Sequence, residues 1–125
     1  MPSDAAVIFA ALKPVFSKVS NRLVLRTATE TLYSFSSKCP SPFPQHKGHP
    51  MDFGSIRLTK SYVSVHLMPI YMAPELTRTI SPALKKHMQG KSCFNFKSTP
   101  EPPLIAELQS LASAGLKQWI AKNWA

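Results

Sequence analysis

His66 and Cys93 are the two side chains of this sequence whose types could together carry out covalent chemistry. An imidazole beside a thiol can accept its proton, and the thiolate so formed is the nucleophile of cysteine enzymes. The positive charge of Lys91, two residues before the cysteine, would favour that thiolate. Catalysis of this kind requires His66 or His87 to lie within hydrogen-bonding distance of the sulfur in the folded chain. A packed structural cysteine and a hydrogen-bonded, half-buried histidine are the simpler interpretation, so we assign no catalytic residue.

A second short motif, Gly90-Lys91-Ser92, matches the end of a phosphate-binding P-loop. The first glycine of that motif would fall at position 85, which is occupied by Lys85. The surrounding pattern also predicts a helix followed by a strand, whereas a P-loop connects a strand to a helix. We therefore predict no nucleotide site of this kind.

Two histidines, His46 and His49, lie in a proline-rich segment not far from Cys39. Imidazole and thiolate are ligands for zinc and copper. Their spacing matches no fixed metal-binding motif, and exposed loop histidines explain the pattern more simply. We predict neither a bound metal nor another cofactor.

A strand is predicted to position the histidine. From Tyr62 to Met68 the side chains alternate, with Val63, Val65 and Leu67 on one face, and Pro69 should end the strand. Residues 93–97 alternate again, with Phe94 and Phe96 sharing a face. If the two strands are adjacent, the polar faces of both form one mixed surface suited to ligand or protein recognition. The candidate ligand-binding residues are then Tyr62, Ser64, His66, Met68, Lys91, Cys93 and Asn95. The alternative is a second packing face.

Two short helices are predicted between these strands, near residues 74–79 and 82–89. Pro74 with Glu75 suits a first helical turn, and Ser81 with Pro82 repeats the signal as N-cap and first helical residue. Gly90 then fits the position just after the second helix, where a positive φ favours glycine.

The rest of the chain gives a coarser pattern. The apolar spacing from Val7 to Val19 predicts an N-terminal helix broken near Pro14. Residues 22–36 have the composition of one strand, although neither of its faces is cleanly apolar. Four prolines predict a loop over residues 37–50.

A hairpin and a long helix complete the pattern. Residues 51–59 predict a strand with a bulge at Gly54, and a turn at 59–61 makes 51–68 a hairpin. The stripe of apolar residues from Leu104 to Trp124 predicts the strongest helix of the chain, which could cover one face of the sheet.

Part of this pattern resembles the YdhG-like family of domains of unknown function. The resemblance lies in Tyr62-Val-Ser-Val-His-Leu-Met-Pro69 and in residues 80–96, of which Met88-Gln-Gly-Lys-Ser-Cys-Phe-Asn-Phe96 is the more specific segment. It covers roughly residues 50–120, while residues 36–50 differ from the family pattern. It implies a small α+β domain with helices against an antiparallel sheet, and no established reaction or catalytic residues.

Some members of that family are called iron chaperones, on a likeness to frataxin. Weakly held iron favours carboxylate-rich sites, and frataxins resemble one another in an acidic first helix. This chain has six acidic residues, of which only Asp4 lies in the first predicted helix. We therefore expect the iron-chaperone description to apply poorly here.

Composition limits the remaining classes of function. Fifteen lysines and arginines give a net charge of +9, a field that attracts anions including nucleic acid, but the basic residues are scattered along the chain. No apolar run approaches the roughly 20 residues of a membrane span, and the N-terminus lacks the basic region of a secretory signal. Two cysteines without paired spacing are typical of free thiols in a reducing cytosol.

The sequence thus predicts a single α+β domain over residues 1–125, with about four antiparallel strands packed against N-terminal and C-terminal helices. The leading functional hypothesis is a non-enzymatic binding or chaperone-like module in the cytosol, whose partner is an unknown small ligand or protein. The alternatives are weak, nonspecific binding of anions or nucleic acid, and an enzyme using Cys93 or His66. A homodimer is compatible with the sequence, and no membrane partner is expected.

Overall fold

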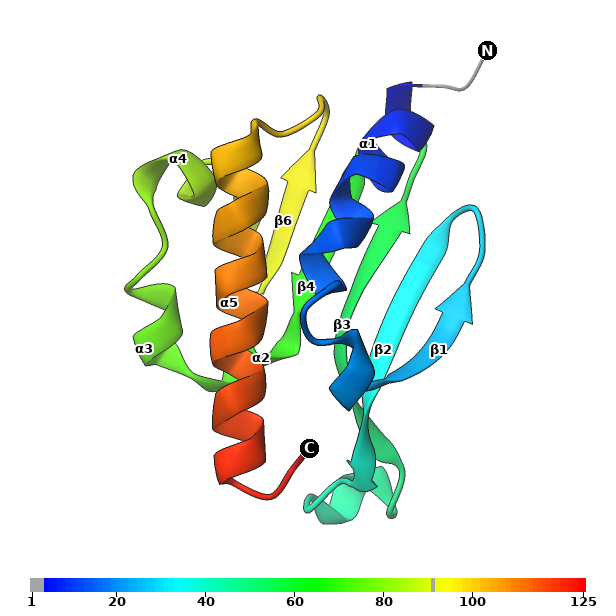
Figure 1. The fold of residues 1–125 in the computed structure, drawn as a ribbon, viewed down its shortest axis with the longest axis vertical. Helices are drawn as coiled ribbons and strands as arrows, with labels where there is room; N and C mark the ends of the chain where they lie inside the picture. Colours follow the sequence, from blue (N-terminus) through cyan, green and yellow to red (C-terminus); the bar gives the residue numbers. More distant parts are fainter. Residues whose placement is uncertain (1–3, 91) are drawn as a thin grey trace.

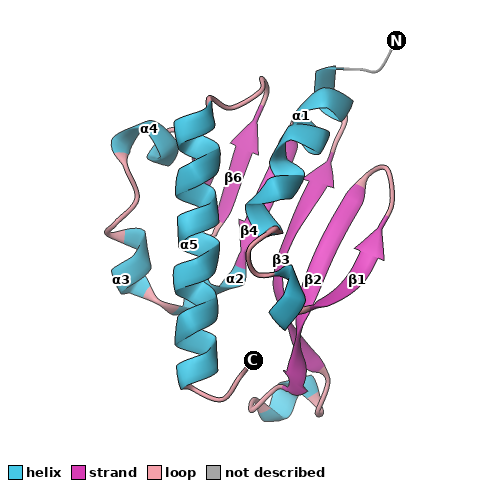
Figure 2. Ribbon diagram, viewed as in Figure 1, coloured by secondary structure: helices cyan, strands magenta, loops and turns pink. Residues whose placement is uncertain are grey.

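The computed structural model of the chain describes residues 4–90 and 92–125, which form a six-stranded antiparallel sheet with helices against one face. Helix α1 (Asp4–Leu12) and the long helix α5 (Pro102–Ala121) lie side by side in front of the sheet (Figures 1 and 2). The strands are β1 (Val24–Ala28), β2 (Leu32–Pro40), β3 (Pro50–Leu58), β4 (Val63–Leu67), β5 (Met88–Gln89) and β6 (Cys93–Phe96), in the order β1-β2-β3-β4-β6-β5. The predicted α+β class is confirmed, and the predicted number of about four strands is too low.

The first additional strand comes from residues 22–36, which form a hairpin rather than one strand. Its turn is built around Thr29, whose hydroxyl accepts hydrogen bonds from the N–H groups of Thr31 and Leu32 at 3.3 and 3.1 Å. A side chain that satisfies the backbone in this way offers the chain an alternative to continuing the strand. The turn contains neither glycine nor proline, which is why the sequence pattern did not reveal it.

The proline-rich loop is shorter than the predicted range of 37–50. Strand β2 continues to Pro40 and pairs with β3 at Pro50, so that the two prolines close the end of the ladder. The residues between them form one 3-10 turn, η3 (Pro44–His46). Phe43 packs against Trp124 with 5.5 Å between ring centroids, which ties this loop to the C-terminal end of the chain.

Between β4 and β5 the chain forms three short helices, α2 (Met68–Met72), α3 (Pro74–Thr77) and α4 (Pro82–Lys85). The strand ends before Pro69 as predicted, and the two later helices are shorter than predicted. Ser81 is the N-cap of α4, because its Oγ accepts a hydrogen bond from the Leu84 N–H at 3.2 Å.

Gly90 has the predicted positive φ, +73°, but it does not end a helix. Helix α4 stops at Lys85, and the chain has already formed β5 when it reaches the turn before β6.

We expect Gly90→Ala to lower the free energy of unfolding by about 1 kcal/mol through backbone strain alone, since no other atom lies within 4 Å of an added Cβ. Urea denaturation of Gly90→Ala and Gly90→Asn measures this. The asparagine variant should lose less, because asparagine tolerates this conformation better, and equal stability of all three proteins would contradict the assignment.

Glu107 of α5 fixes the position of α4. Its two carboxylate oxygens accept hydrogen bonds from the Ser81 N–H at 2.7 Å and the Ser81 hydroxyl at 2.6 Å. The same hydroxyl oxygen caps α4 through Leu84, so one carboxylate orients the whole N-terminus of that helix.

We expect Glu107→Gln to lower the free energy of unfolding by about 1 kcal/mol, because the amide removes the charge from two charge-assisted hydrogen bonds and can accept only through its single oxygen. Urea denaturation provides the measurement. Glu101→Gln, in the exposed residue preceding the same helix, is the matched control and should change stability by less than about 0.5 kcal/mol. Equal effects of the two substitutions would argue against the Ser81 contact.

The core fills the space between the sheet and helices α1 and α5. After α1, the chain turns into the 3-10 segment η1 (Lys13–Phe16), so the predicted break near Pro14 is confirmed. Phe16 packs on Phe35 of β2, and Trp119 packs on Phe53 of β3, with centroid distances of 5.2 and 5.3 Å. The predicted stripe of α5 is buried at Leu108, Leu111, Ala112, Gly115, Leu116 and Trp119. Helix α5 therefore covers the sheet as the periodicity predicted.

Candidate functional site

The second face of the sheet carries mostly polar side chains. In an antiparallel pair, residues directly opposite each other project to the same side, and the register pairs Ser55 with His66, Ser64 with Asn95, and His66 with Cys93. We call these five residues the polar face. All five are half-buried, whereas Val63, Val65 and Phe94, which point toward the helices, are fully buried.

Four of the seven predicted site residues meet on this face, namely Ser64, His66, Cys93 and Asn95. Tyr62 precedes β4, and its side chain lines a hollow near Asp4, beyond the start of the strand. Met68 begins α2 and does not continue the strand, because Pro69 belongs to the first helical turn. Neither residue therefore belongs to β4. Lys91 lies outside the described residues.

His66 contacts the thiol on the neighbouring strand. Its Nδ1 lies 3.4 Å from the Cys93 Sγ and 3.1 Å from the Oγ of Ser92. Ser92 is buried, and the sequence analysis considered it only as part of the rejected P-loop motif. His87, the other histidine considered for this role, lies elsewhere: its Nδ1 hydrogen-bonds the Asn95 carbonyl oxygen at 3.1 Å and its ring stacks on a phenylalanine. Of the two histidines, His66 is the one paired with the cysteine.

The protonation of His66 is set by two opposing effects. Burial lowers the pKa of its imidazole below the ordinary value of 6.5, and the negative charge of Asp52 partly opposes that shift by raising the pKa. Since the two effects together lower the pKa of His66, its ring is mainly neutral at neutral pH. In that state one ring nitrogen can accept a hydrogen bond.

A pocket of about 690 Å³ lies at the α2 end of the sheet. We call it the methionine pocket; it is lined by Phe43, Gln45, His46, His49, Pro50, Met51, Asp52, Met68, Tyr71 and Met72. The lining comes from the loop after β2, from the start of β3 and from α2. Asp52, which lines this pocket, also acts on His66 through its charge.

Several local contacts hold the pocket wall in place. The Ser41 Oγ lies 2.6 Å from the Nδ1 of His46 and accepts a hydrogen bond from the Phe43 N–H at 3.1 Å. Phe43 and His46 also make an edge-to-face contact, with ring centroids 5.7 Å apart. The wall facing α2 is thus ordered by its own side chains.

Sequence reasoning missed this pocket as a site. It noted the two loop histidines as possible metal ligands and assigned Met68 to a strand face. The only sequence signal was the closeness of Met68, Tyr71 and Met72, which is also an ordinary core pattern. Helix α2 meets a loop about 25 residues earlier in the chain because the β3–β4 hairpin brings the two together. Local sequence patterns do not predict a contact over that separation.

The described ranges, 4–90 and 92–125, contain no group of three or more His, Cys, Asp or Glu side chains placed to hold a metal ion. His46 and His49 both line the methionine pocket, whereas Cys39 is not part of its lining.

Within residues 4–90 and 92–125, no helix is both long enough and apolar enough to cross a bilayer.

Comparison with known proteins gives no relative. No family model, no curated protein and no solved structure matches the chain.

Proposed function

We propose that this protein is a non-enzymatic binding module of the cytosol, with a YdhG-like domain, whose methionine pocket takes a small and largely apolar ligand. The observation that carries the proposal is the pocket of about 690 Å³ between the loop after β2 and helix α2. Ligand sites are typically concave, mostly apolar cavities of roughly 300–1,000 Å³ with a few polar groups that orient the ligand.

The lining indicates the class of ligand. Met51, Met68 and Met72 offer flexible, polarizable surface that adapts to ligands of different shape. Phe43 and Tyr71 add aromatic surface for stacking or edge contacts. This composition suits a compact aromatic or aliphatic body.

The polar groups of the pocket favour a ligand with a hydrogen-bond donor. Asp52 is the acidic residue of the lining, and an ionised carboxylate accepts hydrogen bonds but donates none. An amine or hydroxyl group on an otherwise apolar ligand would therefore be oriented toward Asp52.

The resemblance of residues 50–120 to the YdhG-like family supports a small module without a fixed reaction, and we propose no catalytic step in the pocket.

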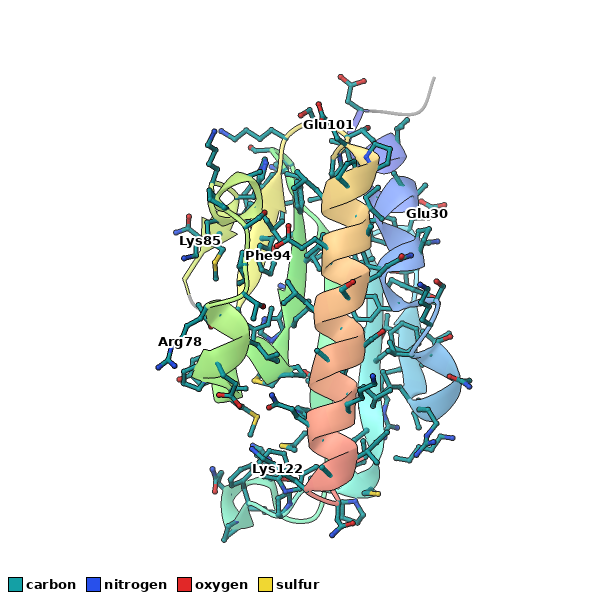
Figure 3. All side chains as sticks on the ribbon, turned by 60° about the vertical axis from the view of Figure 1, so that its left-hand side comes forward. Glu30, Arg78, Lys85, Phe94, Glu101 and Lys122 are labelled. Carbon is teal, nitrogen blue, oxygen red and sulfur yellow. The ribbon has the colours of Figure 1, made fainter. Side chains whose placement is uncertain are left out.

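The basic side chains do not single out a nucleic-acid surface. Arg78 and Lys85 lie on the same side of the molecule, at α3 and α4, whereas Lys122 lies at the far end of α5 (Figure 3). Lys18 and Lys117 line a hollow beside α5, and other basic residues lie around the strands. Because the charges are spread over the surface, we propose no specific nucleic-acid function and expect only weak, salt-sensitive association with polyanions.

A fluorescence titration with N-phenyl-1-naphthylamine tests the proposal. This probe is apolar and uncharged, so the net charge of the protein does not attract it, and it carries one N–H donor. We expect saturable binding to the wild type, weakened by at least about tenfold in Met72→Trp, because an indole would fill the pocket that the probe needs.

Ala114→Trp is the matched control, since it places the same indole beside the separate hollow on α5. It should bind the probe as the wild type does, and circular dichroism should show that both variants are folded. Absence of saturable binding to the wild type, or equal loss in the two variants, would contradict the proposal.

A further inference from the structure

The contact between Cys93 and His66 is formed at the last pair of a regular ladder between β4 and β6. The two residues lie directly opposite each other on β6 and β4, with Val65–Phe94 and Ser64–Asn95 as the next pairs of the ladder. Because four consecutive pairs fix the two backbones, the 3.4 Å separation between Sγ and Nδ1 does not depend on a flexible loop. A thiol and a base placed in this way satisfy the first condition for an activated nucleophile.

Ser92 allows the imidazole to change its protonation state without losing a hydrogen bond. While Nδ1 is unprotonated, the Ser92 hydroxyl can donate to it across 3.1 Å. Once Nδ1 carries a proton, the same hydroxyl oxygen can accept, because a hydroxyl group rotates and is both donor and acceptor. Burial disfavours the imidazolium that forms and lowers the pKa of His66, and the charge of Asp52 offsets part of that cost.

We propose that Cys93 is a nucleophilic thiol that small disulfides modify reversibly, with His66 as its general base. The thiol proton passes from Sγ to the His66 Nδ1. The thiolate then attacks one sulfur of the disulfide, a new bond forms between Sγ and that sulfur, and the original disulfide bond breaks. The second sulfur leaves as a thiolate and takes up the proton held by His66. The incoming disulfide is the oxidant: one of its sulfurs ends in the mixed disulfide with Cys93, and the other ends in a free thiol.

The surroundings of Cys93 define the class of reagent. Among the described residues beside it on the polar face, Ser64, Asn95 and the paired Gln89 are uncharged. The residue is half-buried and does not line the methionine pocket, so part of its surface is accessible to a reagent from outside that pocket. Small, uncharged disulfides fit this surface better than bulky ones.

Reaction of the reduced, full-length protein with 2-hydroxyethyl disulfide at pH 7 tests the proposal, with the adduct at each cysteine followed by peptide mass spectrometry. An ordinary thiol of pKa about 8.5 is only about 3% thiolate at this pH. We expect Cys93 to react roughly tenfold faster in the folded protein than in the same protein unfolded in urea. A cysteine that is merely packed would react more slowly when folded. Cys39, the second free thiol, is the internal reference and should show no acceleration on folding.

Two variants separate activation from accessibility. His66→Gln should remove the acceleration, so that Cys93 reacts no faster folded than unfolded. His87→Gln, which alters a half-buried histidine of the same sheet region without touching the sulfur, should retain it. A wild-type Cys93 that reacts more slowly when folded would overturn the proposal even if His66→Gln does not fold. Acceleration that persists in folded His66→Gln would equally overturn the role of the imidazole.

Discussion

Gly54→Ala is expected to lower the free energy of unfolding by about 3 kcal/mol, the largest effect among the glycine substitutions considered. A Cβ at this position would lie 2.7 Å from the carbonyl oxygen of His66, on the neighbouring strand β4. It would also lie 2.8 and 2.9 Å from two ring carbons of Phe16. Phe16 is fully buried between Phe35 and Phe53, so neither the ring nor the strand can move away cheaply.

The position of Gly54 follows from a bulge in β3. The register changes from Phe35–Gly54 to Ser36–Asp52, which leaves Phe53 as the extra residue on β3. A bulge was predicted at Gly54; the extra residue is its neighbour Phe53, and Gly54 stays paired with Phe35 and Leu67. The bulge lets Phe53 reach Trp119 while Gly54 leaves room for Phe16.

Urea denaturation of Gly54→Ala beside Gly48→Ala measures the contact. Gly48 has a φ of +82° and no atom within 4 Å of an added Cβ, so its substitution should cost only backbone strain, about 1 kcal/mol. A Gly54→Ala variant that is as stable as Gly48→Ala would show that the packing around Phe16 is not as described.

Gly115→Ala is expected to destabilise the protein by about 2 kcal/mol even though it improves helix propensity. Alanine in a helix interior gains about 1 kcal/mol over glycine. A Cβ at Gly115, however, would lie 2.5 and 2.8 Å from the Cβ and Cγ of Pro69 in α2. Overpacking of this severity costs about 3 kcal/mol, so the clash outweighs the propensity. The proline ring is buried and stiff and cannot rotate away.

Ser113→Ala serves as the control for Gly115→Ala. It lies on the same helix and lines the hollow beside Lys18 and Lys117, so it gains propensity without a clash and should raise stability by a few tenths of a kcal/mol. Thermal and urea denaturation give both values. Stabilisation by Gly115→Ala would contradict the close packing of α5 on α2, the helix that carries Met68 and Met72.

The elements that sequence predicted well are those with strong local signals. Alternation over Val63–Leu67 and Cys93–Phe96, the Ser81 cap and the stripe of α5 each depend on neighbouring residues. The extra strands lacked such signals: the β1–β2 turn uses the Thr29 hydroxyl, and β5 is only two residues long. The positive φ of Gly90 was predicted correctly, but the residue was assigned to the end of a helix and not to the turn after β5, because a strand of two residues gives no sequence signal.

The candidate site divides in a similar way. Ser64, His66, Cys93 and Asn95 could be grouped in advance because strand periodicity places alternate residues on one face. Tyr62 and Met68 fall outside β4, which is shorter than the alternating pattern. The methionine pocket joins α2 to a loop about 25 residues earlier, a contact that no local pattern encodes.

The most direct test of the proposed function is an NMR titration of protein labelled with ¹³C at the methionine methyl groups. The chain has five methionines, and three of them, Met51, Met68 and Met72, line the pocket. Met88 on β5 packs against the core outside the pocket and is the internal control. On addition of N-phenyl-1-naphthylamine, the three pocket resonances should shift along one saturable curve while that of Met88 stays in place. Unchanged pocket resonances at probe saturation, or an equal shift of Met88, would contradict the assignment of the methionine pocket as the ligand site.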